Sequence, residues 1–417
     1  MNSPDNAGQP IRLSTELTTP SPLFFGCGIE SHFCAQLGEA CSASPADKVF
    51  LVADQTIHAL HPEFERALRR RFSTELILIE PGEAAKSWEG LEALCEQLLA
   101  RSATKRSVVL AFGGGSVGNL AGLAAALLFR GIRYVEIPTT FMHLTDGVLS
   151  NKQAINGRSG KNLFGTYYAP LFVWADTRYL ETEPVRSRKA GLAEAVKNAM
   201  ISQPELISCL RQALRRDGNY TAAQLTELAL RTIHSKLAIL RRDPGEKDYA
   251  LVLEYGHTFG HALEWLSQGA LLHGECVAVG MKMAAYLAHE RGMISEQTVK
   301  LHYDLLDSCL GLTPVLPPQV NAEPLLAAMK RDNKRTGESL RFVLLEALGC
   351  CAQEHGEPLI TIQDDDFILD FLHRFLGAYP EPLAARRRAQ SAGSTRSRWA
   401  TARVANNVAP AAREVSS

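Results

Sequence analysis

The sequence lacks the features that would place it in a membrane or staple it with disulfide bridges. Its longest apolar run, Leu120 to Phe129, is far shorter than the ~20 residues that a membrane-spanning helix needs. The nine cysteines are odd in number and include no C-x-x-C pair, so neither a disulfide framework nor a thiolate zinc site is expected. The first twenty residues are polar, without the charged-then-apolar pattern of a secretion signal. We therefore expect a cytoplasmic protein with reduced cysteines.

An excess of charge of either sign is also missing. The chain has 44 Lys and Arg against 45 Asp and Glu, which gives a net charge of −1 at pH 7. Neither nucleic acid nor an anionic membrane is therefore expected as a main partner. With 46% hydrophobic and 21% charged residues the composition is that of a globular protein. The 417 residues are enough for about two domains.

Apolar runs alternate with helical patterns in the first part of the chain. The runs are VFLVAD, ELILIE, SVVLAF and RYVEIPTT, and the helical stretches are His58 to Arg71, Trp88 to Arg101 and one that ends at Phe129. This alternation predicts an α/β domain over residues 1–184, with a Rossmann-like, mostly parallel sheet. Ligands of such sheets bind at the carboxyl ends of the strands. Asp54, the loop at Gly113 and the pair Thr139–Thr140 all fall there.

Strand signals fade after about Glu183. Helical patterns rich in Ala, Leu, Lys and Arg run from Arg186 to about Met293 and again beyond His302. We expect a second, mainly α-helical metal-binding domain over residues 185–376. The tail, residues 377–417, is rich in Arg and has little to bury, so it is predicted to be disordered.

A glycine motif opens one of the predicted helices. Gly113, Gly115 and Gly118 form G-x-G-x-x-G directly after an apolar run. In that position backbone N–H groups and the helix N-terminus can bind a pyrophosphate, so we expect a dinucleotide. Tight packing of a turn is the alternative. For the ribose, Asp54 at the end of the first strand is a better partner than Glu136, which lies inside a strand.

A polar stretch, TDGVLSNKQAINGRSGKNLFGTYYAP, connects the two predicted domains. We interpret it as a loop, and a loop of this length inside a compact protein is usually functional. Lys152 and Lys161 in it would suit phosphate as point charges. Other cations that could bind an anion, although each alone could be an ordinary surface residue, are Arg130, Lys197, Lys236 and Lys334.

The segment LVLEYGHTFGHALEWLSQGALLHGE, Leu251 to Glu275, is the strongest candidate for a metal site. His257 and His261 are four residues apart, so on a helix both imidazoles point the same way. His273 follows at a glycine-bounded turn, and Glu194 lies upstream in another helical segment. One carboxylate with two imidazoles suits a catalytic divalent metal that keeps open positions. Histidines four apart also occur on ordinary helix surfaces and in hydrogen-bonded core pairs.

The chain resembles the sugar-phosphate cyclases of the dehydroquinate synthase superfamily from about Val49 to Leu345. The blocks that carry the resemblance are GGGSVGNLAG, FRG, IPTTF, KNLFGTYYAP, GLAEAVKNAM, EYGHTFGHALE and HGECVAVGM. Four features differ from the dehydroquinate synthases themselves: Asn119 replaces Asp, the block VLSNKQAIN replaces SVGGKTAI, Glu254 replaces Asn, and Ala250 replaces Arg. These differences are similar to those of the branch that cyclises glucose 6-phosphate.

The resemblance implies NAD, a divalent metal (zinc or cobalt) and a role for each of the following residues. The metal ligands would be Glu194, His257 and His273. The NAD contacts would be Asp54, Glu83, Lys86, Gly114, Gly115, Asn119, Thr139, Thr140, Lys161 and Asn162. The catalytic residues would be Asp146, Lys152, Glu254 and His261, and the substrate would also contact Lys197, Lys236, Lys334 and, across a homodimer, Arg130.

The implied reaction converts glucose 6-phosphate into a carbocycle. Hydride leaves C4 for NAD+, phosphate is eliminated from C6, hydride returns, and the opened chain closes by an aldol reaction. In this branch the product begins aminoglycoside antibiotic biosynthesis. Three rival interpretations are a dehydroquinate synthase, a metal-dependent polyol dehydrogenase that releases reduced cofactor, and a catalytically dead scaffold. Ala250 opposes the first, the many phosphate-type cations oppose the second, and the intact Glu/His/His set opposes the third.

Overall fold

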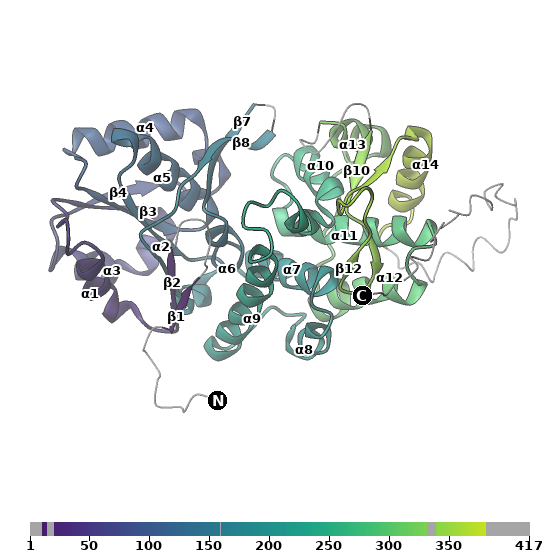
Figure 1. The fold of residues 1–417 in the computed structure, drawn as a ribbon, viewed down its shortest axis with the longest axis horizontal. Coiled ribbons are helices and arrows are strands. Elements are labelled where there is room, and N and C mark those ends of the chain that lie inside the picture. The colour runs from purple at the N-terminus through teal and green to yellow at the C-terminus, as the bar shows by residue number, and fades with distance from the viewer. Residues whose placement is uncertain (1–10, 15–20, 159, 332–338, 381–417) are drawn as a thin grey trace, which may run out of the picture. The chain divides into compact units, whose positions relative to one another are not determined.

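The computed structural model describes residues 11–14, 21–158, 160–331 and 339–380. All of the described residues belong to one compact unit. The predicted disordered tail lies almost wholly outside the described residues. Within this unit, a sheet with its helices precedes a helical part that starts at Val185 (Figure 1). The division into domains at residues 184 and 185 remains a prediction.

A seven-stranded sheet forms the first part of the chain, in the order β1-β2-β9-β6-β5-β3-β4. Every neighbouring pair is parallel except β1 and β2, which are antiparallel. The strands are β1 (Ile11–Ser14), β2 (Pro22–Gly26), β3 (Val49–Asp54), β4 (Thr74–Ile79), β5 (Val108–Gly113), β6 (Arg133–Pro138) and β9 (Val173–Asp176). The prediction of a mostly parallel α/β sheet is confirmed.

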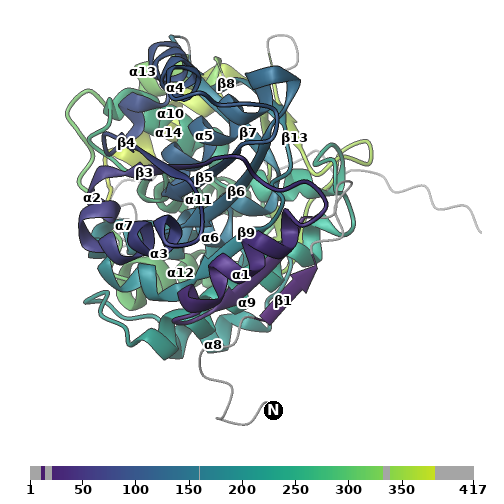
Figure 2. The ribbon, with the colours of Figure 1, turned by 90° about the vertical axis from the view of Figure 1, so that its left-hand side faces the viewer.

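Helices cover both faces of this sheet (Figure 2). They are α1 (Glu30–Ala40), α2 (Gln55–Leu60), α3 (Pro62–Arg69), α4 (Trp88–Ala100), α5 (Gly115–Leu127) and α6 (Phe141–Thr145). Alternate residues of a strand face opposite sides. Phe50 of β3 therefore packs in the core cluster that contains Leu94 of α4 and Leu120 of α5. Leu51 packs on the other side, in the cluster formed with α1 and α3.

The helix predicted from His58 to Arg71 is in fact two helices, which is a correction. Helix α2 ends at Leu60 and α3 begins at Pro62, with His61 between them. Proline has no amide N–H, so it is tolerated in the first turn of a helix but breaks a helix that would continue through it. The short α2 begins directly after β3 and keeps Asp54 at the carboxyl edge of the sheet.

The connecting stretch that the sequence presents as a loop is also different. It forms an antiparallel hairpin of β7 (Lys152–Gly157) and β8 (Gly160–Tyr167), with Lys152 opposite Tyr167. Strand β7 buries Gln153, Ala154 and Ile155, whereas every residue of β8 after Gly160 is exposed. The hairpin packs on α5 through β7.

The second part of the chain is mainly helical, as predicted. Its helices are α7 (Val185–Ile201), α8 (Leu206–Ala213), α9 (Ala222–Leu240), α10 (His257–Ser267), α11 (His273–Glu290), α12 (Glu296–Tyr303), α13 (Ala322–Met329) and α14 (Asp365–Leu376). The pattern did not indicate four short strands: β10 (Leu340–Phe342), β11 (Leu345–Ala347), β12 (Cys350–Cys351) and β13 (Ile360–Ile362). Helix α11 is the centre, because all its residues from Gly274 to Ala288 are buried.

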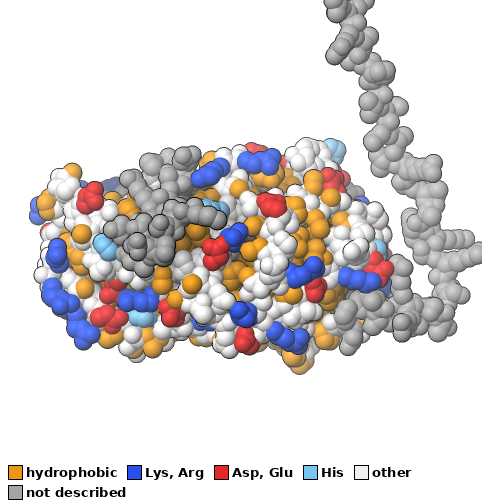
Figure 3. Space-filling view, turned by 90° about the horizontal axis from the view of Figure 1, so that it is seen from below, with side chains coloured by type: hydrophobic (Ala, Val, Ile, Leu, Met, Phe, Trp, Pro, Cys, Tyr) orange, Lys and Arg blue, Asp and Glu red, His pale blue; other side chains and the backbone are white. Residues whose placement is uncertain are grey.

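Short helical segments connect these elements. They are the 3₁₀ helices η2 (Glu83–Ala85), η3 (Leu128–Arg130), η4 (Gly147–Leu149), η5 (Thr177–Thr182) and η6 (Tyr249–Glu254), and the π-helix η7 (Asp304–Cys309). Among the described helices none has both the length and the apolar character to cross a membrane. On the face shown in Figure 3, basic and acidic side chains are interspersed with hydrophobic ones.

Candidate active site

The carboxyl edge of the sheet provides the first half of the site. The chain runs from β3 outward to β4 and then returns to β5 on the other side of β3. Such a switch point is where α/β sheets bind nucleotides. Asp54 ends β3 and Gly113 ends β5, and a Cβ atom on Gly113 would lie 3.3 Å from Cβ of Asp54. The Asp54 carboxylate accepts hydrogen bonds from the amides of Thr56 (2.8 Å) and Ile57 (3.2 Å).

The glycine motif lies at this edge as predicted, with a helix N-terminus behind it. Gly114 precedes α5 and provides no side-chain cap, so the first amides of the helix have no side-chain acceptor at that position. A Cβ atom on Gly114 would lie 3.1 Å from the methyl carbon of Thr140. The amide of Thr139 donates to the carbonyl oxygen of Gly113 at 3.0 Å. Gly114, Gly115, Thr139 and Thr140 are therefore neighbours, and this cradle fits a pyrophosphate.

The hairpin brings the other predicted NAD contacts to the same edge. Lys86 is buried and donates to the amide oxygen of Asn162. Burial lowers the pKa of Lys86, against the opposing charge of Glu83. The Asn119 side chain accepts from the Ala154 amide (3.0 Å) and donates to the Gly115 carbonyl (2.9 Å). It thereby joins the hairpin to the first turn of α5.

Three imidazoles from the helical part converge to form the second half of the site. One ring nitrogen from each of His257, His261 and His273 lies within 4.8 Å of the others. His257 and His261 stand on one face of α10, with ring centroids 5.2 Å apart. His273 is the first residue of α11 rather than part of a turn, and its centroid is 5.3 Å from that of His257. The glycine next to it, Gly274, packs against the backbone of α7.

Hydrogen bonds fix the orientation of two of these rings. Nδ1 of His257 lies 3.1 Å from the carbonyl oxygen of Tyr255, which can only accept, so Nδ1 carries the proton. Nδ1 of His273 lies 3.0 Å from the Glu264 carboxylate and donates to it in the same way. In the neutral form of each ring, Nε2 is then the nitrogen that carries the lone pair. Metal-binding histidines almost always have such an arrangement.

Glu194 of α7 completes the donor set. Its Oε1 lies 3.9 Å from Nε2 of His257, and the residue is 1% exposed. Neither carboxylate oxygen accepts a hydrogen bond within the described part of the chain, although Oε2 forms an ion pair with Lys197. Lys197 compensates the charge at Oε2, but the buried Oε1 has no hydrogen-bond donor in this part of the chain, and such an oxygen is costly. A divalent cation bound between Glu194 and the imidazoles would remove that cost, so the donor set fits a metal.

Two ion pairs bring further predicted residues to the site. The Lys236 ammonium donates to the side-chain carboxylate of Asp146 (2.6 Å) and to the backbone carbonyl oxygen of Asp146 (3.0 Å). Burial would raise the pKa of the Asp146 carboxyl, but the charges of Lys236 and Lys197 outweigh it and lower the pKa to about 2. Lys152 of the hairpin pairs with Glu246 at 2.6 Å. Glu254, half-buried, ends η6 three residues before the first histidine.

Glu264 is the residue that sequence reasoning missed. Its carboxylate accepts from His273 and also from Lys161 of the hairpin, at 2.6 Å. Burial would raise the pKa of this carboxyl, but His273 and Lys161 outweigh it and hold the pKa well below its usual range. Glu264 follows His257 by seven residues, about two helical turns. Periodicity alone could therefore have placed it on the same face.

Three predicted residues remain, namely Arg130, Lys334 and Glu83. Arg130 is exposed at the end of η3, with φ of 66°. Lys334 lies outside the described residues. Lys161 also reaches Glu83 at 3.6 Å, and Glu83 in turn accepts from Asn156.

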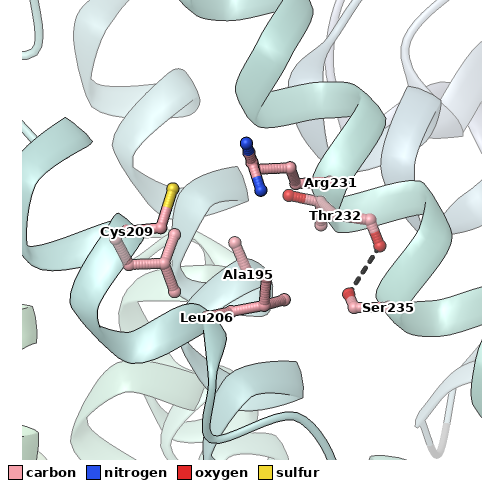
Figure 4. Close-up of a pocket in the computed structure, with 7 residues that line it drawn as sticks. Ala195, Leu206, Cys209, Arg231, Thr232 and Ser235 are labelled. Carbon is pink, nitrogen blue, oxygen red and sulfur yellow. Dashed lines mark hydrogen bonds between the residues drawn. The ribbon is translucent and has the colours of Figure 1, made fainter. Parts of the chain in front are cut away.

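A small pocket in the helical part is separate from this arrangement. Figure 4 shows it among Ala195, Leu206, Cys209, Arg231, Thr232 and Ser235. Its volume of about 10 Å³ is enough for one water molecule. It is therefore too small to hold a sugar phosphate.

Comparison with known proteins places this arrangement in a family. Residues 76–190 match the family model of the 3-dehydroquinate synthase N-terminal domain, and residues 191–335 match that of the C-terminal domain. A 2-deoxy-scyllo-inosose synthase of Micromonospora echinospora is 39% identical over 326 residues, which cover 77% of this chain and 82% of that protein. The chain belongs to the 2-deoxy-scyllo-inosose synthase family.

Two solved structures are similar to this chain over most of its length. A crystal structure of 2-deoxy-scyllo-inosose synthase in complex with carbaglucose-6-phosphate, NAD+ and Co²⁺ aligns with a TM-score of 0.78 and 31% identity, over 88% of this chain and 99% of that one. A 2-epi-5-epi-valiolone synthase from Streptomyces hygroscopicus, with NAD+ and Zn²⁺ bound, aligns with a TM-score of 0.69 and 26% identity, over 81% and 93% of the two chains.

Proposed function

We propose that this chain is an NAD- and metal-dependent cyclase that converts glucose 6-phosphate into 2-deoxy-scyllo-inosose. The observation that carries the proposal is the convergence of Glu194 with three imidazoles whose ring nitrogens lie within 4.8 Å. The name of the relatives and the ligands of the aligned crystal structure support the same substrate class and cofactors.

Glu194, His257 and His273 would hold the metal, and the glycine motif with Thr139 and Thr140 would hold NAD+. A divalent cation supplies polarisation of sugar hydroxyl oxygens, and NAD+ supplies a reversible acceptor of hydride. The buried carboxylate of Glu194 and the fixed tautomers of the two histidines prepare this site before substrate enters.

The other side chains would bind and move protons. Lys152, Lys197 and Lys236 carry charge that suits the phosphate group. Lys152 is 44% exposed and bound to Glu246, so the phosphate would replace that carboxylate as its partner. His261 and Glu254 are the candidates for proton transfer. His261 stands on the same face of α10 as His257, and Glu254 lies directly before the turn that leads into this helix.

Three finer statements are part of the proposal. One phosphate leaves for each ring formed, so the enzyme is a carbon–oxygen lyase, and NAD+ is restored in every turnover. The product would be the precursor of an aminoglycoside antibiotic. The working form would be a homodimer in which the exposed Arg130 of one protomer contacts the substrate of its partner.

The test is incubation with glucose 6-phosphate, NAD+ and Co²⁺, with phosphate release followed over time and the product identified by NMR. We expect 2-deoxy-scyllo-inosose and equal amounts of phosphate, with no steady accumulation of NADH. Stoichiometric NADH without phosphate release would instead show a polyol dehydrogenase. The absence of any reaction would favour the scaffold.

Substrate choice separates this function from that of dehydroquinate synthase. Ala250 is buried in η6, and its amide donates to Asp243 at 3.0 Å. It provides no cation for a substrate carboxylate, and a charge-assisted hydrogen bond contributes about 1.5–3 kcal/mol. At ~1.4 kcal/mol per tenfold change, its loss lowers kcat/KM by about one to two decades. We expect glucose 6-phosphate to be preferred over the seven-carbon carboxylated sugar phosphate of the shikimate route. Equal or better use of the carboxylated compound would contradict the assignment.

A further inference from the structure

Tyr255 links a metal-ligand candidate to the helical core. It lies between Glu254 and the Gly256–His257 pair, and it is fully buried. Its carbonyl oxygen accepts the Nδ1 proton of His257 at 3.1 Å. Its hydroxyl lies 2.9 Å from Nε2 of His302, which is on α12, 47 residues away in sequence. Tyr255 therefore contacts His257 through its backbone carbonyl and the distant helix α12 through its side-chain hydroxyl.

The direction of both hydrogen bonds follows from the acceptors. Nδ1 of His302 lies 2.8 Å from the carbonyl oxygen of Thr298, so Nδ1 is protonated and donates. Nε2 of a neutral His302 is then an acceptor, and the Tyr255 hydroxyl must donate to it. His302 is 0% exposed, and burial lowers its pKa to about 4, so the ring is neutral near pH 7. The carbonyl oxygen of Met281 also lies within reach of the Tyr255 hydroxyl, at 3.5 Å, so His302 is the nearer of its two acceptors.

The turn that carries Tyr255 has little room to move. Gly256 has φ of 78°, a conformation that favours glycine, and a Cβ atom on it would lie 2.7 Å from the amide nitrogen of Met281. A Cβ atom on Gly280 would lie 2.0 Å from the carbonyl oxygen of Gly256. The turn is thus pressed against α11, the helix that begins with His273. The hydrogen bond between the Tyr255 hydroxyl and His302 also attaches this turn to α12.

We propose that Tyr255 and His302 are positioning residues for the metal site. Their hydrogen bond holds the Tyr255 carbonyl where it fixes the tautomer and the ring plane of His257, so that the Nε2 lone pair faces Glu194. The inference rests on the proposed function, because it requires that His257 binds a divalent metal. Partners one shell outside a metal ligand typically change metal affinity 10–100-fold. Tyr255 acts through its backbone, so we expect about tenfold for loss of its hydroxyl.

A purely structural role would also bury this hydrogen bond, so the experiment has to separate stability from positioning. Loss of the Tyr255 hydroxyl removes the donor to the buried Nε2 of His302, and loss of His302 leaves the hydroxyl with the more distant carbonyl oxygen of Met281. Loss of both can be nearly neutral for stability. Tyr255→Phe and His302→Leu should each lower the melting temperature, and the double variant should recover most of that loss. His302→Gln keeps one acceptor and one donor and serves as the conservative rescue.

The measurement is metal affinity of the full-length apoprotein, by competition of Zn²⁺ and Co²⁺ with a chelating indicator, together with the visible spectrum of the Co²⁺ form. Tyr179→Phe is the matched control, because Tyr179 is equally buried and donates to Glu30 at 3.1 Å in the sheet part of the chain. We expect Tyr255→Phe and the double variant to bind both metals about tenfold more weakly, with an altered Co²⁺ spectrum. His302→Gln and the control should match the unaltered protein.

Metal affinity in the double variant decides the outcome. If it returns to that of the unaltered protein together with the melting temperature, the pair is only structural and the inference is wrong. The inference is equally wrong if Tyr255→Phe melts earlier but binds both metals with unchanged affinity and spectrum. If the unaltered protein itself binds neither metal, the proposed function fails first.

Discussion

Glu264 shows how much of this site depends on single carboxylates. It accepts from Nδ1 of His273 at 3.0 Å and from the Lys161 ammonium at 2.6 Å, and its side chain is 8% exposed. A carboxylate in this position raises the basicity of the imidazole and fixes its tautomer. The pKa of His273 reflects this, because burial lowers it and the Glu264 charge more than offsets that effect.

Glu264→Gln should therefore weaken metal binding about 10–100-fold while the fold is retained. An amide oxygen accepts less strongly than a carboxylate, and Lys161 keeps Glu83 as a partner. The measurement is a Zn²⁺ titration of the apoprotein. Glu227→Gln on α9 is the control, because Glu227 pairs only with Arg231 among the described residues, on the same exposed helix face. Unchanged Zn²⁺ affinity in Glu264→Gln would show that Glu264 does not support the metal site.

At the scale of elements, the sequence predicts those parts whose pattern is local. Buried runs such as VFLVAD match β3 within a residue, because parallel strands are apolar on both faces. The histidine helix α10 is equally visible from its spacing. The hairpin β7–β8 is not, because β8 is exposed on both faces and carries no alternation of apolar and polar residues. The position of the hairpin depends on contacts with residues that are distant in the sequence, and a local pattern does not contain them.

Asn119 is the contact that best explains how this hairpin is held. Its side chain bridges the Gly115 carbonyl and the Ala154 amide, and Ala154 is two residues from Lys152. We expect Asn119→Ala to destabilise the protein by about 1–3 kcal/mol and to speed amide exchange across residues 152–157. Hydrogen exchange followed by mass spectrometry checks this, with Asn219→Ala on an exposed loop as control. Equal amide exchange across residues 152–157 in Asn119→Ala and Asn219→Ala would show that Asn119 does not hold the hairpin.

At the scale of the whole molecule, buried acids make stability depend on pH. Glu136 of β6 is 2% exposed, and its neighbours are the side chains of Gln153 at 3.5 Å and His143 at 4.0 Å. Burial raises the pKa of Glu136 to about 7. A carboxyl whose pKa is higher in the folded than in the unfolded protein stabilises the fold below its ordinary pKa. That stability is lost as the pH rises through 7.

Glu136→Gln should remove this dependence, because glutamine keeps the shape without the titration. Relative to the unaltered protein, the variant should gain up to about 3 kcal/mol of unfolding free energy between about pH 5 and pH 8. Urea unfolding at both pH values measures this gain. Glu75→Gln on β4, the edge strand of the same sheet, is the control, since Glu75 is 43% exposed. The expectation would be wrong if the free energy of unfolding changed with pH by the same amount in Glu136→Gln and in the unaltered protein.

Glu264 is shared by Lys161, a proposed NAD+ contact, and His273, a proposed metal ligand, so we expect the two cofactor sites to be thermodynamically coupled. A phosphate of NAD+ that draws Lys161 away leaves the whole carboxylate charge to the imidazole, so NAD+ should tighten metal binding. Linkage requires the metal to tighten NAD+ binding by the same factor. A coupling of about fivefold or more, at the lower end of what such interactions give, is expected from calorimetric titration of each ligand with and without the other. It should vanish in Glu264→Gln. Through the shared Glu264 carboxylate, NAD+ and the metal would then bind cooperatively before any substrate is present.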